Sequence, residues 1–199
     1  MWWVELLNVI SGVHGAPTPP VTNSYQSIST VTVGAGGSSS ITFSSIPSTY
    51  KHLQIRYIAK GTSTSGGYPT GSDLSLNSDT TNSNYFGHYL RGDGSSATAG
   101  SGISARNSVI FVPGSSGSWS SSSTFGTGIV EILDYTNTSK YKTIRALSGA
   151  DANGAGAVSL NSMTWANTSA VTSITITADP TYTTNFAQYS SFALYGIKG

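Results

Sequence analysis

Cysteine is absent from the 199 residues of this chain, which excludes disulfide bonds and thiolate metal ligands. Charged side chains are also scarce, at 9% of residues against about 25% in an average globular protein. The formal net charge is +1, and no cluster of lysine and arginine would attract a phosphate backbone or an anionic lipid surface. We therefore expect no nucleic acid and no membrane insertion, and a surface made of serine, threonine, asparagine, glycine and tyrosine.

Helical patterns are missing from Tyr25 onward, where no apolar run keeps a helical period over three turns. The chain instead has short β-branched and aromatic runs, separated by Gly, Ser, Asn and Asp clusters that are typical of turns. These runs predict strands near residues 27–33, 40–43, 50–60, 73–77, 85–90, 108–112, 128–135, 140–147, 157–160, 172–178 and 191–197. Many short strands without helices predict an all-β fold, an antiparallel two-sheet sandwich that is jelly-roll-like.

Two of these runs indicate how the strand faces are used. Residues 50–60 (YKHLQIRYIAK) alternate, so one face is predicted to lie in the core and the other in water. The expected core positions are Leu53, Ile55, Tyr57 and Ala59, and the expected wet positions are His52, Gln54, Arg56 and Lys60. Residues 128–135 (GIVEILDY) are apolar on both faces, as in a strand that a second sheet or a neighbouring subunit covers.

Residues 1–13 (MWWVELLNVISGV) carry apolar residues at helical spacing with a narrow polar face. Because so short a helix is marginal alone, residues 1–15 are predicted to be a helical or extended anchor that docks on another protein; packing on its own domain is the alternative. The anchoring residues are Trp2, Trp3, Leu6, Leu7, Val9 and Ile10. The segment lacks the basic start and cleavage site of a signal peptide. It is also shorter than the roughly 20 residues of a membrane span.

The proline-rich stretch that follows blocks helix continuation and favours an extended spacer. Residues 16–24 are therefore a linker between the anchor and a β-sandwich domain at 25–199.

No residue pattern indicates catalysis. The histidines at positions 14, 52 and 88 are interpreted as solvated or hydrogen-bonded side chains, not as ligands. Glu131 and Asp134 are three residues apart, which places them on opposite faces of a strand and argues against a shared glycosidase site. The stretches RGDG at 91–94 and DANG at 151–154 are interpreted as turns, the second because it lacks the remaining ligands of a calcium loop. We expect no catalytic residue, no metal site and no cofactor.

Aromatic residues indicate a binding surface. The chain has 11 Tyr and 4 Trp on a Ser/Gly/Asn background, a composition typical of adaptable recognition surfaces. Trp119 stands alone in a Ser/Gly loop, so it is a candidate exposed recognition residue; pinning of that loop and contact with another subunit are its alternatives.

Four stretches carry a resemblance to a known group of proteins. They are SYQSISTVTVGAGGSSSITFSSIPSTYKHLQIRYIAK from Ser24, the YxxHYLRGDGSSA stretch from Tyr85, FGTGIVEILDYTNTSKYKTIRALSGADANG from Phe125, and NFAQYSSFALYGIKG from Asn185. In this order they resemble small virion structural proteins of tailed bacteriophages, of the tail-fibre and minor-tail kind. The resemblance implies a jelly-roll-type domain presented on the particle exterior.

These features together lead us to expect a non-enzymatic virion protein, made in the host bacterial cytoplasm and displayed on the virion surface. It would be a homotrimeric small fibre or adhesin for host attachment, with its N-terminus anchored on other virion proteins of the tail, baseplate or capsid. A capsid decoration (cement) protein that stabilises the head lattice is the alternative. A carbohydrate-binding module for a host surface glycan is the third interpretation.

Overall fold

A computed structural model describes residues 24–62, 70–102, 110–112, 123–151, 156–178 and 185–199 of the chain. The expected anchor at 1–15 and Trp119 lie outside the described residues. The elements are β1 (Tyr25–Thr32), β2 (Ser40–Phe43), β3 (His52–Ala59), β4 (Thr70–Leu76), the short 3-10 helix η1 (Asn82–Asn84), β5 (Tyr85–Gly92), β6 (Ala97–Gly102), β7 (Ile110–Val112), β8 (Gly126–Leu133), β9 (Lys142–Asp151), β10 (Gly156–Trp165), β11 (Ile174–Thr177) and β12 (Ser191–Ile197).

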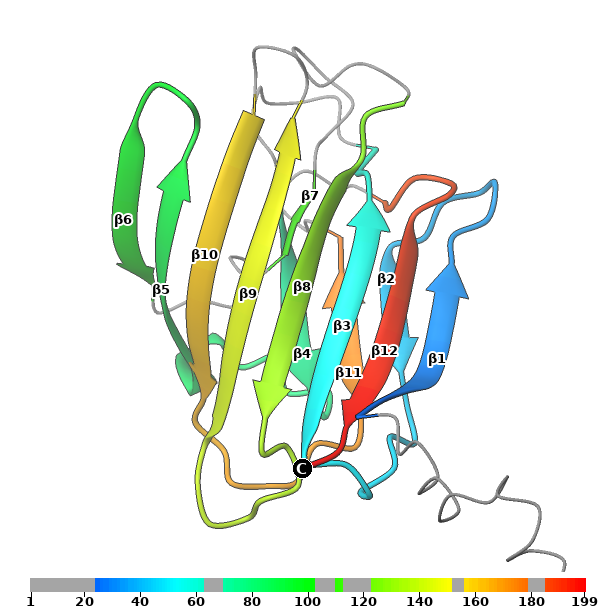
Figure 1. Ribbon diagram of the computed structural model, residues 1–199, viewed down its shortest axis with the longest axis vertical. Coiled ribbons are helices and arrows are strands. Elements are labelled where there is room, and N and C mark those ends of the chain that lie inside the picture. Colours follow the sequence, from blue (N-terminus) through cyan, green and yellow to red (C-terminus); the bar gives the residue numbers. More distant parts are fainter. Residues whose placement is uncertain (1–23, 63–69, 103–109, 113–122, 152–155, 179–184) are drawn as a thin grey trace, which may run out of the picture.

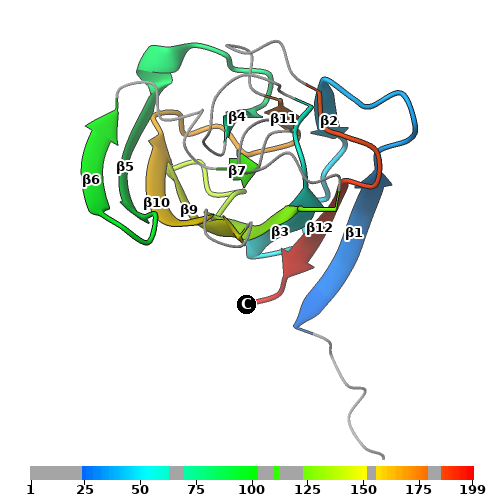
Figure 2. The same ribbon diagram turned by 90° about the horizontal axis from the view of Figure 1, so that it is seen from above.

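The strands form two antiparallel sheets. The larger sheet has the order β1-β12-β3-β8-β9-β10-β5-β6, and the smaller sheet has the order β2-β11-β4-β7. In Figure 1 the larger sheet stands in front of the smaller one, and Figure 2 shows from above how it curves around it. The predicted all-β, two-sheet antiparallel sandwich is confirmed.

Strand connectivity identifies the sandwich as an extended jelly roll. Without β5, β6, β9 and β10, the order β1-β12-β3-β8 stands opposite β2-β11-β4-β7. Strands that follow one another then cross between the sheets, except that β4 and β7 pair within the smaller sheet, as in the double Greek key of a jelly roll. The hairpins β5–β6 and β9–β10 lengthen one sheet from four strands to eight.

The core lies between the sheets and follows from alternation along each strand. In β8, Val130 and Ile132 point inward and are fully buried. They face a layer that includes Leu74 of β4 and Ile174 of β11, also fully buried. The four predicted core positions of β3, Leu53, Ile55, Tyr57 and Ala59, are all buried, as expected.

Two positions of the same stretch that were predicted to be solvent-exposed are instead buried. Gln54 is 4% exposed and Lys60 is 4% exposed. Gln54 points to the outer face, but its amide accepts a hydrogen bond from Arg56 and donates one to Glu131. Long neighbouring side chains therefore cover it, which alternation along a single strand cannot show.

One strand was not predicted at all. The residues of β6, ATAGSG, include a single β-branched residue and no aromatic one, so their propensity for a strand is low. Their place in the sheet comes from pairing with β5, from Gly87↔Gly102 to Gly92↔Ala97. Among the described residues no helix is long and apolar enough to cross a membrane.

Candidate functional site

The outer face of the larger sheet, which is turned away from the smaller sheet, carries a row of aliphatic side chains. Ile129 of β8 pairs with Leu147 of β9, Leu147 pairs with Leu160 of β10, and Leu160 pairs with Leu90 of β5. These four side chains are therefore direct neighbours across four strands. Along their strands, Ile129, Leu147 and Leu160 alternate with buried residues and Leu90 alternates with half-buried ones, which places the row on the solvent side.

The adjacent row adds Ile58 of β3 and Val158 of β10. We call the six residues the apolar band, and their exposed fractions are Ile58 50%, Leu90 54%, Ile129 39%, Leu147 52%, Val158 55% and Leu160 55%. Single exposed aliphatic residues are ordinary on protein surfaces, but a contiguous set marks a contact surface. Completing the burial of each half-exposed side chain would contribute about 1 kcal/mol.

A polar row runs beside the band. Arg145 of β9 donates to Glu131 of β8 at 2.8 Å from Nη2 to Oε2. Glu131 also accepts from Gln54 at 3.4 Å, and Gln54 accepts from Arg56 at 2.8 Å. The carboxylate and both guanidinium groups are thus already engaged inside one chain.

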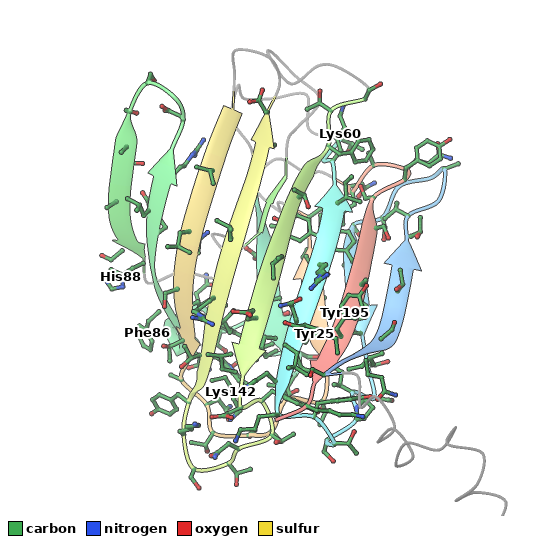
Figure 3. The ribbon with its side chains drawn as sticks, viewed as in Figure 1. Tyr25, Lys60, Phe86, His88, Lys142 and Tyr195 are labelled. Carbon is green, nitrogen blue, oxygen red and sulfur yellow. The ribbon has the colours of Figure 1, made fainter. Side chains whose placement is uncertain are left out.

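Arg56 has two further neighbours at the edge of the sheet. Its guanidinium carbon lies 5.5 Å from the ring centre of Tyr25 in β1 and 5.5 Å from that of Tyr195 in β12. Figure 3 shows the two tyrosines on neighbouring strands of the same face. The contact holds the start of β1 to the body by cation–π attraction.

A buried cation, Lys142, lies on the face of β9 opposite to Arg145. The Lys142 side chain is fully buried, and its Nζ donates to the carbonyl oxygens of Asn137 at 2.6 Å, Lys140 at 3.1 Å and Thr168 at 2.9 Å. Burial lowers the pKa of Lys142, and the charge of Lys140 lowers it further. Because all three ammonium hydrogens have acceptors, this group fastens two connecting segments and is not free for chemistry.

Two carboxylates have pKa values near 2 for structural reasons. Hydrogen bonds from Lys140 and then Lys51 lower the pKa of Asp134 to about 2. Partial burial raises the pKa of Asp79, but hydrogen bonds from Trp165, Asn84 and Thr81 outweigh it and bring the value to about 2. Each carboxylate joins segments that are far apart in the sequence.

The stretch RGDG forms the end of β5 and the turn to β6, as predicted. The Asp93 carboxylate accepts backbone hydrogen bonds from Ser96 and Ser95 and hydroxyl hydrogen bonds from both serines. These bonds hold the pKa of Asp93 well below its usual range. The turn borders a shallow depression of about 790 Å³, lined largely by glycine, alanine and valine with Asp93 and Asp151 at its edge.

The remaining candidate residues are not brought together. Glu131 lies on the outer face, whereas Asp134 follows the end of β8 and pairs with lysines. His52 accepts a hydrogen bond from the Asp134 backbone, and His88 is exposed on β5. In the part of the chain that the structure describes, no three His, Asp or Glu side chains are grouped to hold a metal ion. The anchor residues, Trp119, His14 and most of the DANG stretch lie outside that part.

Sequence reasoning missed the apolar band, although one signal was present. Residues 128–135 were expected to be covered on both faces, and the smaller sheet covers only the inner one. Ile129 remains 39% exposed. The pattern predicts cover by a second sheet or by a neighbouring subunit. Because the smaller sheet covers only the inner face, a neighbouring subunit is the remaining candidate for the outer face.

The chain matches no family model, and comparison with curated proteins and with solved structures gives no match.

Proposed function

We propose that this protein is a non-enzymatic structural component of a bacteriophage virion, displayed on the particle surface and held there by contacts between proteins. The observation that carries the proposal is the apolar band. An exposed face with this much aliphatic surface is a contact for another macromolecule, and Glu131 and Arg145 beside it are already paired within the chain.

The titratable groups with shifted pKa values support a structural role. Strongly shifted values often mark catalytic sites. Here Asp79, Asp93, Asp134 and Lys142 are each saturated by hydrogen bonds that tie turns and connecting segments together. Hydrogen bonds lower the pKa values of the three carboxylates, and burial lowers that of Lys142, so each shift has a structural cause.

The sequence pattern of the N-terminal segment and the sequence resemblance support an exterior position on the virion. An apolar anchor at 1–15, a proline-rich linker and a β-sandwich form the order expected of a small tail-fibre or head-fibre protein. In this arrangement Trp2, Trp3 and Leu6, with the other anchor residues, bind a neighbouring virion protein. The sandwich projects outward.

Mass spectrometry of purified particles tests the proposal directly. The protein should be present in stoichiometric amounts, and its copy number distinguishes two positions. A few to a few dozen copies indicate a tail or head fibre, whereas hundreds indicate a decoration protein on the capsid. Particles that contain none of the protein would refute a virion role.

Variants of the anchor test how the protein is held. Replacing Trp2, Trp3 and Leu6 with serine should abolish incorporation, because the apolar surface that docks is lost, while circular dichroism still reports a folded β domain. Replacing Asn8 with serine, a change on the polar face of the same segment, is the matched control and should incorporate normally. Equal incorporation of both variants would contradict docking by the anchor.

A further inference from the structure

We propose that Tyr25, Arg56 and Tyr195 form a binding site for an acidic sugar, a pyranose that carries a carboxylate directly on its ring as a hexuronate does. We call these three residues the Arg56 site. The argument uses the charge of Arg56, the way in which its guanidinium is held, and the two tyrosines beside it. The site is a property of the purified chain, so it is independent of the virion role.

Arg56 carries a positive charge that the described chain does not neutralise. It lies on the outer face of the larger sheet, and its side chain is exposed. On the same face Arg145 is neutralised by Glu131 at 2.8 Å, whereas no carboxylate of the described residues forms an ion pair with Arg56. The N–H groups of a guanidinium lie in one plane and fit a carboxylate with two parallel hydrogen bonds. A carboxylate is therefore the anion that this position fits.

The guanidinium is held in place before any ligand binds. Nε of Arg56 donates to Oε1 of Gln54 at 2.8 Å. The Gln54 amide is itself buried, and its Nε2 donates to Glu131 at 3.4 Å, which turns Oε1 toward Arg56. The guanidinium carbon also lies 5.5 Å from the ring centres of Tyr25 and Tyr195. Because Nε is the donor that these contacts use, the N–H groups of both Nη atoms remain for a ligand, at little cost in conformational entropy.

The two tyrosines favour a sugar as the carrier of the carboxylate. Tyr25 is 46% exposed and Tyr195 is half-buried, and among the described residues neither hydroxyl has a hydrogen-bond partner. Phenol hydroxyls donate to and accept from sugar hydroxyls. The exposed part of the Tyr25 ring offers apolar surface to the C–H groups of a pyranose.

Other anions fit these groups less well. A phosphate brings more negative charge than one guanidinium compensates, and the chain has no cluster of lysine and arginine to add to it. An aspartate or glutamate side chain brings a carboxylate but no hydroxyl groups for the tyrosines. A hexuronate brings the charge, the hydroxyls and the C–H groups together on one ring.

The Arg56 site is open to a sugar unit within a longer chain. Its residues lie on β1, β3 and β12, at one end of the larger sheet. Figure 2 shows that the outer face of this sheet is convex, and Figure 3 shows Tyr25 and Tyr195 together on it. A polysaccharide therefore reaches the guanidinium from solvent without entering a cleft.

Binding of a galacturonate trimer to the purified full-length protein tests the site. Isothermal titration calorimetry should give a dissociation constant in the millimolar range or tighter. The methyl ester of the trimer keeps the sugar rings and removes the charge, so it should bind at least about tenfold more weakly. No binding of the trimer at about 10 mM would overturn the inference.

A glutamate tripeptide with blocked termini separates the sugar from the charge. It carries as many carboxylates as the trimer but no sugar ring, and it should bind at least about threefold more weakly. Equal binding of the tripeptide would assign Arg56 to an acidic peptide and overturn the sugar site. Binding of the methyl ester as tight as that of the trimer would show that Arg56 does not read the carboxylate, which would also overturn it.

Variants connect the binding to the named residues. Arg56→Gln should weaken binding of the trimer at least about tenfold, and Tyr25→Ala at least about threefold. The matched controls are Lys140→Gln, which removes a cation that is 55% exposed elsewhere, and Tyr141→Ala, which removes a tyrosine that is 55% exposed elsewhere. Both controls should bind the trimer as the wild type does.

Circular dichroism and the unfolding midpoint show whether the variants remain folded. If Arg56→Gln unfolds the domain, Arg56→Lys keeps the charge but lacks the planar pair of donors, and it should also weaken binding. A folded Arg56 variant with wild-type affinity would overturn the site. A protein that enters particles but does not bind the trimer would refute only this site, and one that binds the trimer but is absent from particles would refute only the virion role.

Discussion

Replacing Lys142 with methionine tests whether a buried ammonium fastens the lower end of the sandwich. Methionine keeps the length of the side chain and removes the three donors. The carbonyl oxygens of Asn137, Lys140 and Thr168 then lose donors that lie 2.6 to 3.1 Å away. Two connections, β8–β9 and β10–β11, are no longer tied to β9 (Figure 3).

The magnitude is a balance of two terms. Hydrogen bonds to a charged group contribute about 1.5–3 kcal/mol each, and taking the ammonium out of water costs several kcal/mol. We therefore expect Lys142→Met to lower the free energy of unfolding by about 2–4 kcal/mol. Urea unfolding at neutral pH, followed by circular dichroism, measures the difference.

Lys140→Met is the matched control, since it makes the same substitution two residues earlier. The Lys140 side chain is 55% exposed and pairs with Asp134, so its loss should change stability by less than about 1 kcal/mol. A Lys142→Met protein as stable as the wild type would refute the reasoning, because the free-energy cost of desolvating the ammonium would then equal the free energy that its hydrogen bonds contribute.

The pH dependence checks the same balance. Burial lowers the pKa of Lys142 below the usual 10.5, so the folded chain releases this proton at a lower pH than the unfolded chain. The unfolded state then binds more protons, and stability relative to Lys142→Met should rise as the pH increases toward 10.5. If the stability difference between wild type and Lys142→Met shrinks as the pH rises toward 10.5, the hydrogen bonds to the three carbonyl oxygens stabilise the charged amine more than burial destabilises it.

Two further predictions concern the fold. The pKa of Asp79 is about 2 in the folded chain, below the usual 3.8, so its contribution is present above about pH 4 and lost as the pH falls toward 2. The stability difference between wild type and Asp79→Asn should therefore be constant from pH 5 to 7 and vanish near pH 2 in urea titrations; a constant difference down to pH 2 would contradict this. A Cβ at Gly128 would lie 2.5 Å from Oη of the buried Tyr57, so Gly128→Ala should cost about 1–3 kcal/mol. At Gly36 nothing lies within 4 Å of an added Cβ, so Gly36→Ala should change the free energy of unfolding by no more than about 0.5 kcal/mol. Equal unfolding midpoints for the two variants would argue against a steric overlap between the Cβ at position 128 and Tyr57.

Much of the fold could be predicted because strand alternation is a local property. The alternation in residues 50–60 identified Leu53, Ile55, Tyr57 and Ala59 as core positions, and the glycine-rich turn at 91–94 was recognised from its residues. The buried Gln54 and the strand β6 were not recognised. Both depend on neighbouring strands, which the local pattern does not contain.

The sequence by itself determined the strands other than β6, the inward face of residues 50–60 and an apolar surplus on residues 128–135. Only the tertiary structure decided that Ile58, Leu90, Ile129, Leu147, Val158 and Leu160 form one surface. The physical reason is that alternation tells which residues of a strand share a face, whereas strand order and register decide which faces become neighbours. Residues 90 and 129 reach the same row because β9 and β10 lie between β8 and β5.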